Sequence, residues 1–224
     1  MTAILVVATI LIFLAVDWII QRSRKGKTAP AGVVAWPAEK QPFPIRMPDG
    51  IFFARSHTWL SLFPSGMIRL GVDDFIANLL ERAEVTLIKN EGDRVEKGEP
   101  LLVLSQNGRA LTVRAPISGD ILAVNEKLEG SLRLKHARLF RDGWAYTIRP
   151  GSPDQLRGLL LGSASQAWMA DELRRLRDFF TAAMGNGLPA QTVLQDGGAP
   201  VPGALLRLSS EAWRRFEQQF LQAE

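Results

Sequence analysis

The chain has no cysteine, only two histidines and a single tyrosine among its 224 residues. The absence of cysteine excludes a disulfide, a thiolate nucleophile and any cysteine-ligated zinc or iron–sulfur site. The two histidines, His57 and His136, lie far apart in the sequence with no cluster of carboxylates nearby, which leaves too few ligands for a tetrahedral zinc site. We therefore expect His57, which stands close to Trp59, to have a structural role.

Other signals of chemistry are also missing. No glycine-rich loop that would cradle a phosphate precedes a helix, and the carboxylates are scattered along the chain. The net charge of +4 is small, and a surplus of this size does not indicate a nucleic-acid partner. We expect no metal, no cofactor, no nucleic acid and no small-molecule substrate, and we predict that the protein is not an enzyme.

One long apolar run is present, at residues 3–20, and its length is typical of a helix that crosses a bilayer. Basic residues follow it at Arg22, Arg24, Lys25 and Lys27, while none precedes it. No small-residue cleavage site follows the run, so an uncleaved anchor is favoured over a secretory signal. The positive-inside rule then predicts an inner-membrane protein with its N-terminus outside and the rest of the chain at the cytoplasmic face.

The anchor and the segment after it contain three candidate partner-binding residues. Asp17 lies within the apolar run, where a carboxylate either contacts a partner helix or reaches the nearby interface beside Trp18. Residues 28–50 contain five prolines and are predicted to form a stiff, extended linker. Trp36 and Phe43 are candidate anchors through which this linker contacts a neighbour.

The folded part is expected to begin after Asp49-Gly50. Alternating apolar residues predict two short strands joined around the turn at residues 64–66. Residues 73–83 have helical spacing, with Asp73 or Asp74 as the cap, and a strand is predicted at 85–88. The run from Leu101 to Leu122 then predicts a hairpin, because Asn107-Gly108 between two apolar stretches suits a type I′ turn.

Several short motifs occur in an order that resembles a known family. They are His57-Thr58-Trp59, the G-D-x-V-x-x-G-x-x-L run from Gly92 to Leu101, Ala115 to Gly119 with Asn125-Glu126, Gly143-Trp144 with Ile148, and Ser152 to Leu156. Between about Phe53 and Leu173 the chain resembles the biotinyl/lipoyl domains, and specifically the H protein of the glycine cleavage system. This resemblance implies a mainly β, α+β fold: a flattened barrel or sandwich of two small sheets, a barrel-sandwich hybrid with flanking helices.

The chain departs from that family at the tip of the hairpin. H proteins carry a Glu-Ser-x-Lys sequence whose lysine holds lipoate, and the resemblance places Ser105 to Gly108 at these positions, with Gly108 at the lysine. A shift by one residue gives Arg109, whose guanidinium cannot replace the amine as an acyl acceptor. No lysine occurs between Lys97 and Lys127. The lipoyl position is therefore interpreted as degenerate, with neighbours Asn107 and Arg109.

Two helices are expected in the C-terminal part. Residues 163–166 resemble a capping box that opens a helix ending at Gly185, with an apolar stripe that packs on the domain or, as an alternative, lies on the membrane. A short strand is possible at 192–194, and Ser209 or Ser210 is expected to cap a last amphipathic helix. The candidate partner-binding residues of the folded part are Arg109 and Arg114 beside the tip, and Trp213, Phe216 and Phe220 on one face of the last helix.

These observations predict four segments: a transmembrane anchor at 1–27, a linker at 28–50, an H-protein-like domain at 51–177 and a helical extension at 178–224. The leading hypothesis is a non-catalytic, membrane-anchored scaffold without lipoate, acting as an accessory or assembly subunit of a membrane protein complex and contacting lipid and other subunits. Two alternatives remain. One is a lipoyl or acyl carrier that uses Lys89, Lys127 or Lys135, and the other is a membrane-anchored adaptor of a transport system.

Overall fold

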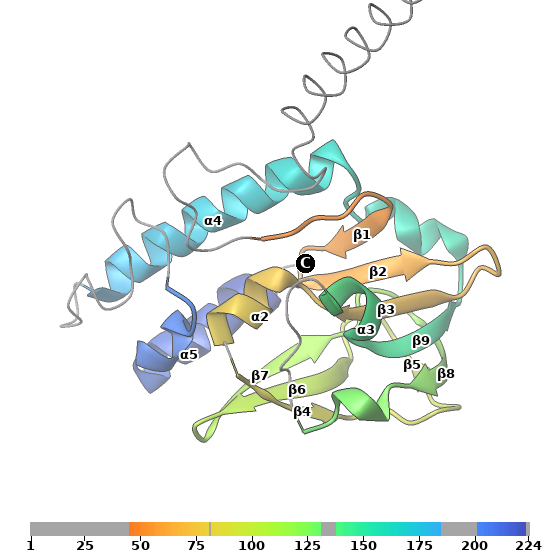
Figure 1. The fold of residues 1–224 in the computed structure, drawn as a ribbon, viewed down its shortest axis with the longest axis horizontal. Helices are drawn as coiled ribbons and strands as arrows, with labels where there is room; N and C mark the ends of the chain where they lie inside the picture. Colours follow the sequence, from red (N-terminus) through yellow and green to blue (C-terminus); the bar gives the residue numbers. More distant parts are fainter. Residues whose placement is uncertain (1–44, 81, 131–137, 185–200, 223–224) are drawn as a thin grey trace, which may run out of the picture.

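The computed structural model describes residues 45–80, 82–130, 138–184 and 201–222 (Figure 1). Asp17, Trp36, Phe43, the predicted anchor and most of the linker lie outside these ranges, as does the strand expected at 192–194. Within the described ranges, the helices are too short or too polar to cross a membrane. The anchor therefore stays a prediction from the sequence.

The larger of two antiparallel sheets has six strands. Three of them come from the segment where the sequence predicted two, because the chain turns at His57, whose φ of 59° lies in the left-handed region. In the order in which they pair, the strands are β1 (Ile51–Ala54), β2 (Thr58–Leu62), β3 (Ile68–Val72), β9 (Trp144–Pro150), β8 (Gly119–Val124) and β5 (Arg94–Val95).

The smaller sheet has three strands, β4 (Glu84–Leu87), β6 (Pro100–Gln106) and β7 (Arg109–Arg114), with β6 in the middle. Strands β6 and β7 form the predicted hairpin, with Gln106 paired to Arg109 across the turn. Asn107 and Gly108 have φ values of 51° and 73°. Both central residues therefore have the positive φ of a type I′ turn, and the prediction made from the Asn-Gly pair is confirmed.

Helices pack beside the two sheets, with α4 running alongside β1 (Figure 1). Asp73 Oδ1 accepts a hydrogen bond from Ile76 N at 3.2 Å, and Ser209 Oγ accepts one from Ala212 N at 3.1 Å. Of the two residues considered for each helix cap, Asp73 and Ser209 are therefore the ones that cap. The helices are α2 (Asp74–Leu80), α3 (Leu139–Asp142), α4 (Ser163–Met184) and α5 (Ser210–Phe216), which continues as the π-helical turn η6 (Glu217–Leu221); the 3₁₀ turns are η1 (Glu126–Leu128), η3 (Pro153–Gly158) and η5 (Ala204–Arg207).

The predicted capping box at the start of α4 is not in the expected register. Ser163 is already part of the helix, and Gln166 N donates to Gly162 O. The hydroxyl of Ser165 donates to the same carbonyl at 2.7 Å. Helix α4 therefore starts one residue earlier than the sequence pattern indicated.

Both sheets and the helices share one hydrophobic core. The stripe of α4 packs into it, since Trp168, Met169 and Phe180 are buried, and this favours the packing interpretation of the stripe over the membrane-facing one. The core also includes side chains from residues 204–221. The boundary predicted between residues 177 and 178 falls inside α4, and the C-terminal helices belong to the same packed body.

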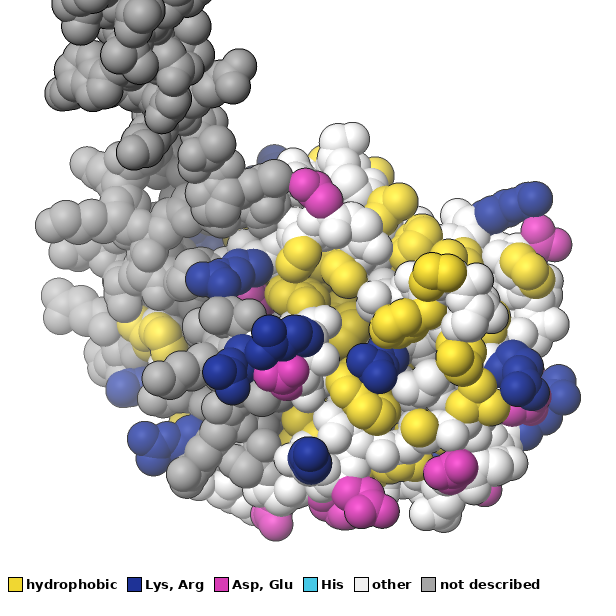
Figure 2. Space-filling model, turned by 45° about the vertical axis from the view of Figure 1, so that its right-hand side comes forward, with side chains coloured by type: hydrophobic (Ala, Val, Ile, Leu, Met, Phe, Trp, Pro, Cys, Tyr) yellow, Lys and Arg dark blue, Asp and Glu magenta, His cyan; other side chains and the backbone are white. Residues whose placement is uncertain are grey.

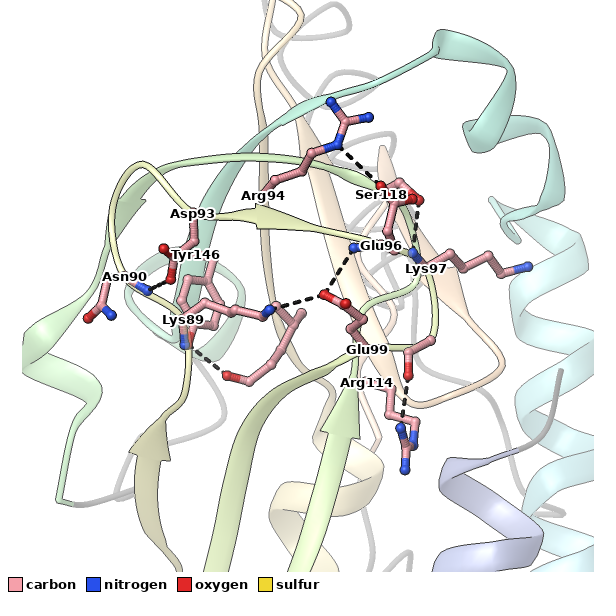
Figure 3. Close-up of polar contacts among 12 residues, drawn as sticks. Lys89, Asn90, Asp93, Arg94, Glu96, Lys97, Glu99, Arg114, Ser118 and Tyr146 are labelled. Atoms are coloured by element: carbon pink, nitrogen blue, oxygen red, sulfur yellow. Dashed lines mark hydrogen bonds and ion pairs between the residues drawn. The ribbon is translucent and has the colours of Figure 1, made fainter.

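A buried tyrosine joins the two sheets. Tyr146 on β9 accepts hydrogen bonds from the amides of Ile88 at 3.0 Å and Lys89 at 3.1 Å, and its hydroxyl donates to Leu101 O at 2.7 Å (Figure 3). Burial raises the pKa of this phenol above its ordinary value. The hydroxyl thus satisfies three backbone groups at the point where β4 ends and β6 begins.

Candidate functional site: the β6–β7 hairpin

The tip of the hairpin is the part of the domain that the sequence singled out. Asn107 and Gly108 are exposed, while Leu104 and Leu111, which pair with each other further along the two strands, are buried. A Cβ atom built on Gly108 would meet nothing within 4 Å. The tip has room for a side chain, and its glycine is explained by the left-handed φ of the turn rather than by crowding.

The arginine next to the tip is held by the chain itself. Arg109 Nη1 donates a hydrogen bond to Leu208 O, and its guanidinium lies over the ring of Trp213 at 5.7 Å. Arg109 was predicted as a candidate partner-binding residue beside the tip. Instead, the structure places it as a link between the hairpin and the C-terminal segment.

The C-terminal segment also satisfies the free edge of β7. This strand pairs with β6 on one side only. On its other side Ala110 O accepts a hydrogen bond from Trp213 Nε1 at 2.8 Å, and the amide of Thr112 donates to Glu217 Oε1 at 2.9 Å. Two backbone groups that a strand edge would present to solvent are therefore bonded to side chains of α5 and η6.

The three aromatic residues predicted as a partner-binding face are inside the protein. Trp213, Phe216 and Phe220 are at most 3% exposed. Phe216 and Phe220 stack with ring centroids 4.7 Å apart, and Phe179 of α4 meets both rings edge-on. The sequence correctly placed these residues on one face of the helix, but that face packs on the domain and is not available to a partner.

Arg114 does not lie beside the tip. It pairs with Pro100 at the far end of the hairpin and donates to Gly98 O at 2.9 Å (Figure 3). The expectation that Arg109 and Arg114 flank the tip together is wrong, because they stand at opposite ends of β7. The structure leaves Asn107 and Gly108 as the exposed residues of the tip.

Of the lysines considered as alternative acyl acceptors, Lys89 is engaged and Lys127 is exposed. Lys89 Nζ lies 3.0 Å from Glu99 Oε2, and this hydrogen bond lowers the pKa of the Glu99 carboxyl (Figure 3). Lys127 is in η1, which follows β8 of the larger sheet and is not part of the β6–β7 hairpin. Lys135 lies outside the described residues.

A buried charged cluster around His57 was not predicted. His57 Nδ1 lies 2.8 Å from Asp73 Oδ2, and Nε2 lies 3.4 Å from Glu172 Oε1 on α4. The imidazole stacks on Phe75, with ring centroids 4.1 Å apart and planes within 4°. Burial by itself would lower the pKa of His57, but the carboxylates of Asp73 and Glu172 outweigh it and raise the pKa to about 9.

The His57 cluster continues to the C-terminal segment through α4. Arg175 Nη1 donates to Glu172 Oε2 at 2.7 Å, and Nη2 of the same guanidinium donates to Gln219 O at 3.0 Å. This chain of contacts ties the turn before β2 and the cap of α2 to α4 and then to η6. The one sequence signal for it was Glu172, a charged residue within the apolar stripe of α4.

The His57 cluster is suited to holding elements together rather than to binding a ligand. His57, Asp73 and Glu172 are all buried, with exposed fractions of 0% to 1%. Among the described residues, no group of three or more histidine and acidic side chains is placed to hold a metal ion. The structural role expected for His57 fits this geometry.

Two packed antiparallel sheets, a projecting hairpin and covering helices define a mainly β domain of the hybrid type, as the sequence predicted. The chain belongs to the glycine cleavage H-protein family, whose model matches residues 51–172, slightly more than half of the chain. The match nearly coincides with the region from Phe53 to Leu173 in which the sequence motifs occur.

Relatives agree with this assignment. The glycine cleavage system H protein of Shewanella halifaxensis is 32% identical over 126 residues, which are 56% of this chain and 98% of the relative. That of Chromobacterium violaceum is 31% identical over 118 residues, 53% of this chain and 92% of the relative. A crystal structure of an H protein from Mycobacterium marinum matches 56% of this chain and 99% of its own at 22% identity, with a TM-score of 0.47.

Proposed function

We propose that this protein is a non-catalytic scaffold that has kept the H-protein fold without its lipoyl arm. It acts as an accessory or assembly subunit of a membrane protein complex, held at the cytoplasmic face by its N-terminal helix. The observation that carries the proposal is the hairpin tip, where Asn107-Gly108 closes a type I′ turn and no lysine is present. An amide-linked arm needs a lysine amine, and the neighbouring Arg109 cannot supply one.

The C-terminal segment supports the same proposal. Residues 204–221 pack against β7 and bond to Arg109, Ala110 and Thr112. A carrier hairpin must be reached from several sides by the enzymes that load and use its arm. In this chain one side of the hairpin is covered by its own C-terminal helix, which favours a fixed structural role.

The apolar run at residues 3–20 and its basic flank are the reason for placing the scaffold at a membrane. A single helix with a proline-rich connector fixes the domain near the bilayer while leaving it free to contact other subunits. The expected partners are integral membrane subunits and lipid, with no cofactor bound by the domain.

The test is intact-mass and size measurement on the full-length chain, expressed in its own membranes and extracted with mild detergent. We expect the unmodified mass and co-elution with other subunits at fixed stoichiometry. A mass increased by a lipoyl amide would contradict the loss of the arm, whether it is attached to Lys127 or to another lysine. A monodisperse monomer without stoichiometric partners would contradict the scaffold role.

A further inference from the structure

An arginine stands in the middle of the outward face of the larger sheet. Arg69 on β3 is paired with Ser61 on β2 and with Thr147 on β9, and all three residues are partly exposed. Their neighbours in β3, Ile68 and Leu70, are buried on the opposite face. The residues on either side of Arg69 are short, so the guanidinium is not covered by longer chains from adjacent strands.

Two aromatic rings hold the guanidinium of Arg69. Its Cζ atom lies 5.0 Å from the ring centroid of Phe63 and 4.9 Å from that of Trp144, within the range of a cation–π contact. A cation–π contact does not use the N–H donors of a guanidinium, which stay available for a planar, bidentate partner. Among the described residues, none forms an ion pair or hydrogen bond with the Arg69 guanidinium.

Apolar side chains lie at the adjacent end of the sheet. Leu62, the last residue of β2, is 44% exposed, and Met67, just before β3, is 37% exposed. Between them the partly exposed Phe63 donates a backbone hydrogen bond to Met67 O. Figure 2 brings this end of the molecule forward and shows hydrophobic side chains gathered over it, with charged side chains mostly towards the periphery. Exposed apolar patches of this kind mark interaction surfaces.

We propose that this face, formed by Leu62, Phe63, Met67, Arg69 and Trp144, is the docking surface for a partner protein that inserts an aspartate or glutamate carboxylate between apolar side chains. The charge selects the occupant, because a guanidinium that pairs with no carboxylate in the described part of the chain matches a bidentate acidic group. Tryptophan and arginine at the centre of a patch are also the residues that dominate binding energy in interfaces. The inference deepens the proposed scaffold function, on which it rests, by naming where a subunit binds.

The test uses two synthetic heptapeptides that differ only at the centre, aspartate or asparagine, flanked by leucine and phenylalanine. Binding to the full-length chain in detergent micelles is followed by NMR through the indole N–H of Trp144, assigned with Trp144→Phe. We expect saturable shifts with the aspartate peptide and affinity weaker by at least about tenfold with the asparagine peptide, because the charge-assisted hydrogen bonds are lost.

Matched variants distinguish the effect of the Arg69 charge on binding from an effect on folding. Arg69→Gln is expected to remove the preference for aspartate, Arg69→Lys to keep part of it, and Arg149→Gln, which changes an exposed arginine on β9, to leave it intact. Thermal unfolding of each variant checks that the fold is retained. Equal affinity for both peptides, or an unchanged preference in Arg69→Gln, would overturn the proposal.

A last measurement tests the occupant in the complex itself. The full-length Arg69→Glu variant is expressed in native membranes and its co-eluting subunits are quantified. We expect loss of one stoichiometric subunit while the intact mass stays unmodified. If the variant retains all its subunits, the docking surface is wrong but the scaffold function still stands. If the wild type is a homodimer that Arg69→Glu dissociates, the occupant is a second copy of this chain and the proposal of an acidic partner protein is overturned.

Discussion

His57 Nδ1 and Asp73 Oδ2 lie 2.8 Å apart with both side chains buried, and this pair connects the turn before β2 to the start of α2. Asp73 serves two purposes, because its other carboxylate oxygen accepts the amide of Ile76 at the first turn of the helix. Glu172 completes the arrangement from α4. Removing one member of such a buried ionic cluster is strongly destabilising, because a buried charge is then left uncompensated.

The stability of the protein is expected to fall as pH rises above neutrality. The pKa of His57 is raised from 6.5 to about 9 in the folded state, so its stabilisation is complete below pH 6.5 and is lost as pH rises through 9. The loss amounts to about 3 kcal/mol. Urea unfolding at a series of pH values from 6 to 9.5 measures it. His57→Asn, which tolerates the left-handed φ, should flatten this dependence, and an unchanged slope would contradict the assignment.

Glu172→Gln is expected to lower the free energy of unfolding by about 3 kcal/mol, because it leaves His57 with one carboxylate and removes the carboxylate that pairs with Arg175. Asp171→Asn is the matched control, since Asp171 is 60% exposed one residue earlier in the same helix. Its effect should stay within about 0.5 kcal/mol. Chemical denaturation distinguishes the two, and similar values for both variants would show that the buried cluster does not stabilise the fold.

Glu217→Ala is expected to speed hydrogen exchange at the amide of Thr112. The variant removes the acceptor at 2.9 Å and leaves this edge amide unpaired. Its cost in stability should be about 1–3 kcal/mol. The exposed neighbour Gln218 provides the control, because Gln218→Ala should leave exchange at Thr112 as it is. Protection of Thr112 that survives in Glu217→Ala would mean that another group caps the strand.

Gly71→Ala is expected to destabilise the larger sheet by more than about 1 kcal/mol through overpacking. A Cβ atom at this position would lie 2.4 Å from Gly143 O and 3.0 Å from two atoms of the Trp59 ring. Gly158→Ala is the control, because the corresponding Cβ meets nothing within 4 Å. Thermal unfolding compares the two, and equal midpoints would contradict the close approach of Trp59 and residue 143.

Gly108→Lys is expected to fold and to remain without lipoate. The space around the residue is open, so the main cost is the left-handed φ of 73°, about 1–2 kcal/mol. Lipoylation should still fail, because the acidic residue of the H-protein motif is absent and α5 covers one side of the hairpin. The variant is incubated with a lipoate ligase, and intact-mass measurement shows whether a lipoyl group has been added. An H protein carrying the Glu-Ser-x-Lys sequence is the positive control. Efficient modification would show that the recognition surface has been retained.

The local features of the fold could be predicted from the sequence, because short-range chemistry determines them. Asn107-Gly108 predicted its turn, and the motif order between residues 53 and 173 predicted the domain. The sequence narrowed two helix caps to neighbouring pairs of residues, from which the structure selects Asp73 and Ser209. The third strand at the start of the larger sheet was missed because His57 makes a left-handed turn that usually needs glycine.

Long-range contacts could not be predicted in the same way. The helical spacing of Trp213, Phe216 and Phe220 correctly indicated an apolar face, but periodicity does not tell whether such a face meets the domain or a partner. The approach of Glu172 to His57 spans 115 positions in the sequence and depends on how α4 crosses the sheet. The sequence signal for this contact was Glu172 itself, a charged residue within the apolar stripe of α4.

The bonds that α5 and η6 make to β7 have a consequence for how the domain meets other copies of itself. An uncovered outer strand is a template on which another chain can add by edge-to-edge pairing, and this pairing leads to aggregation. With Ala110 O and Thr112 N already taken by Trp213 and Glu217, that route is closed at β7. The C-terminal segment therefore removes two of the backbone groups through which a second copy of this chain could add to β7.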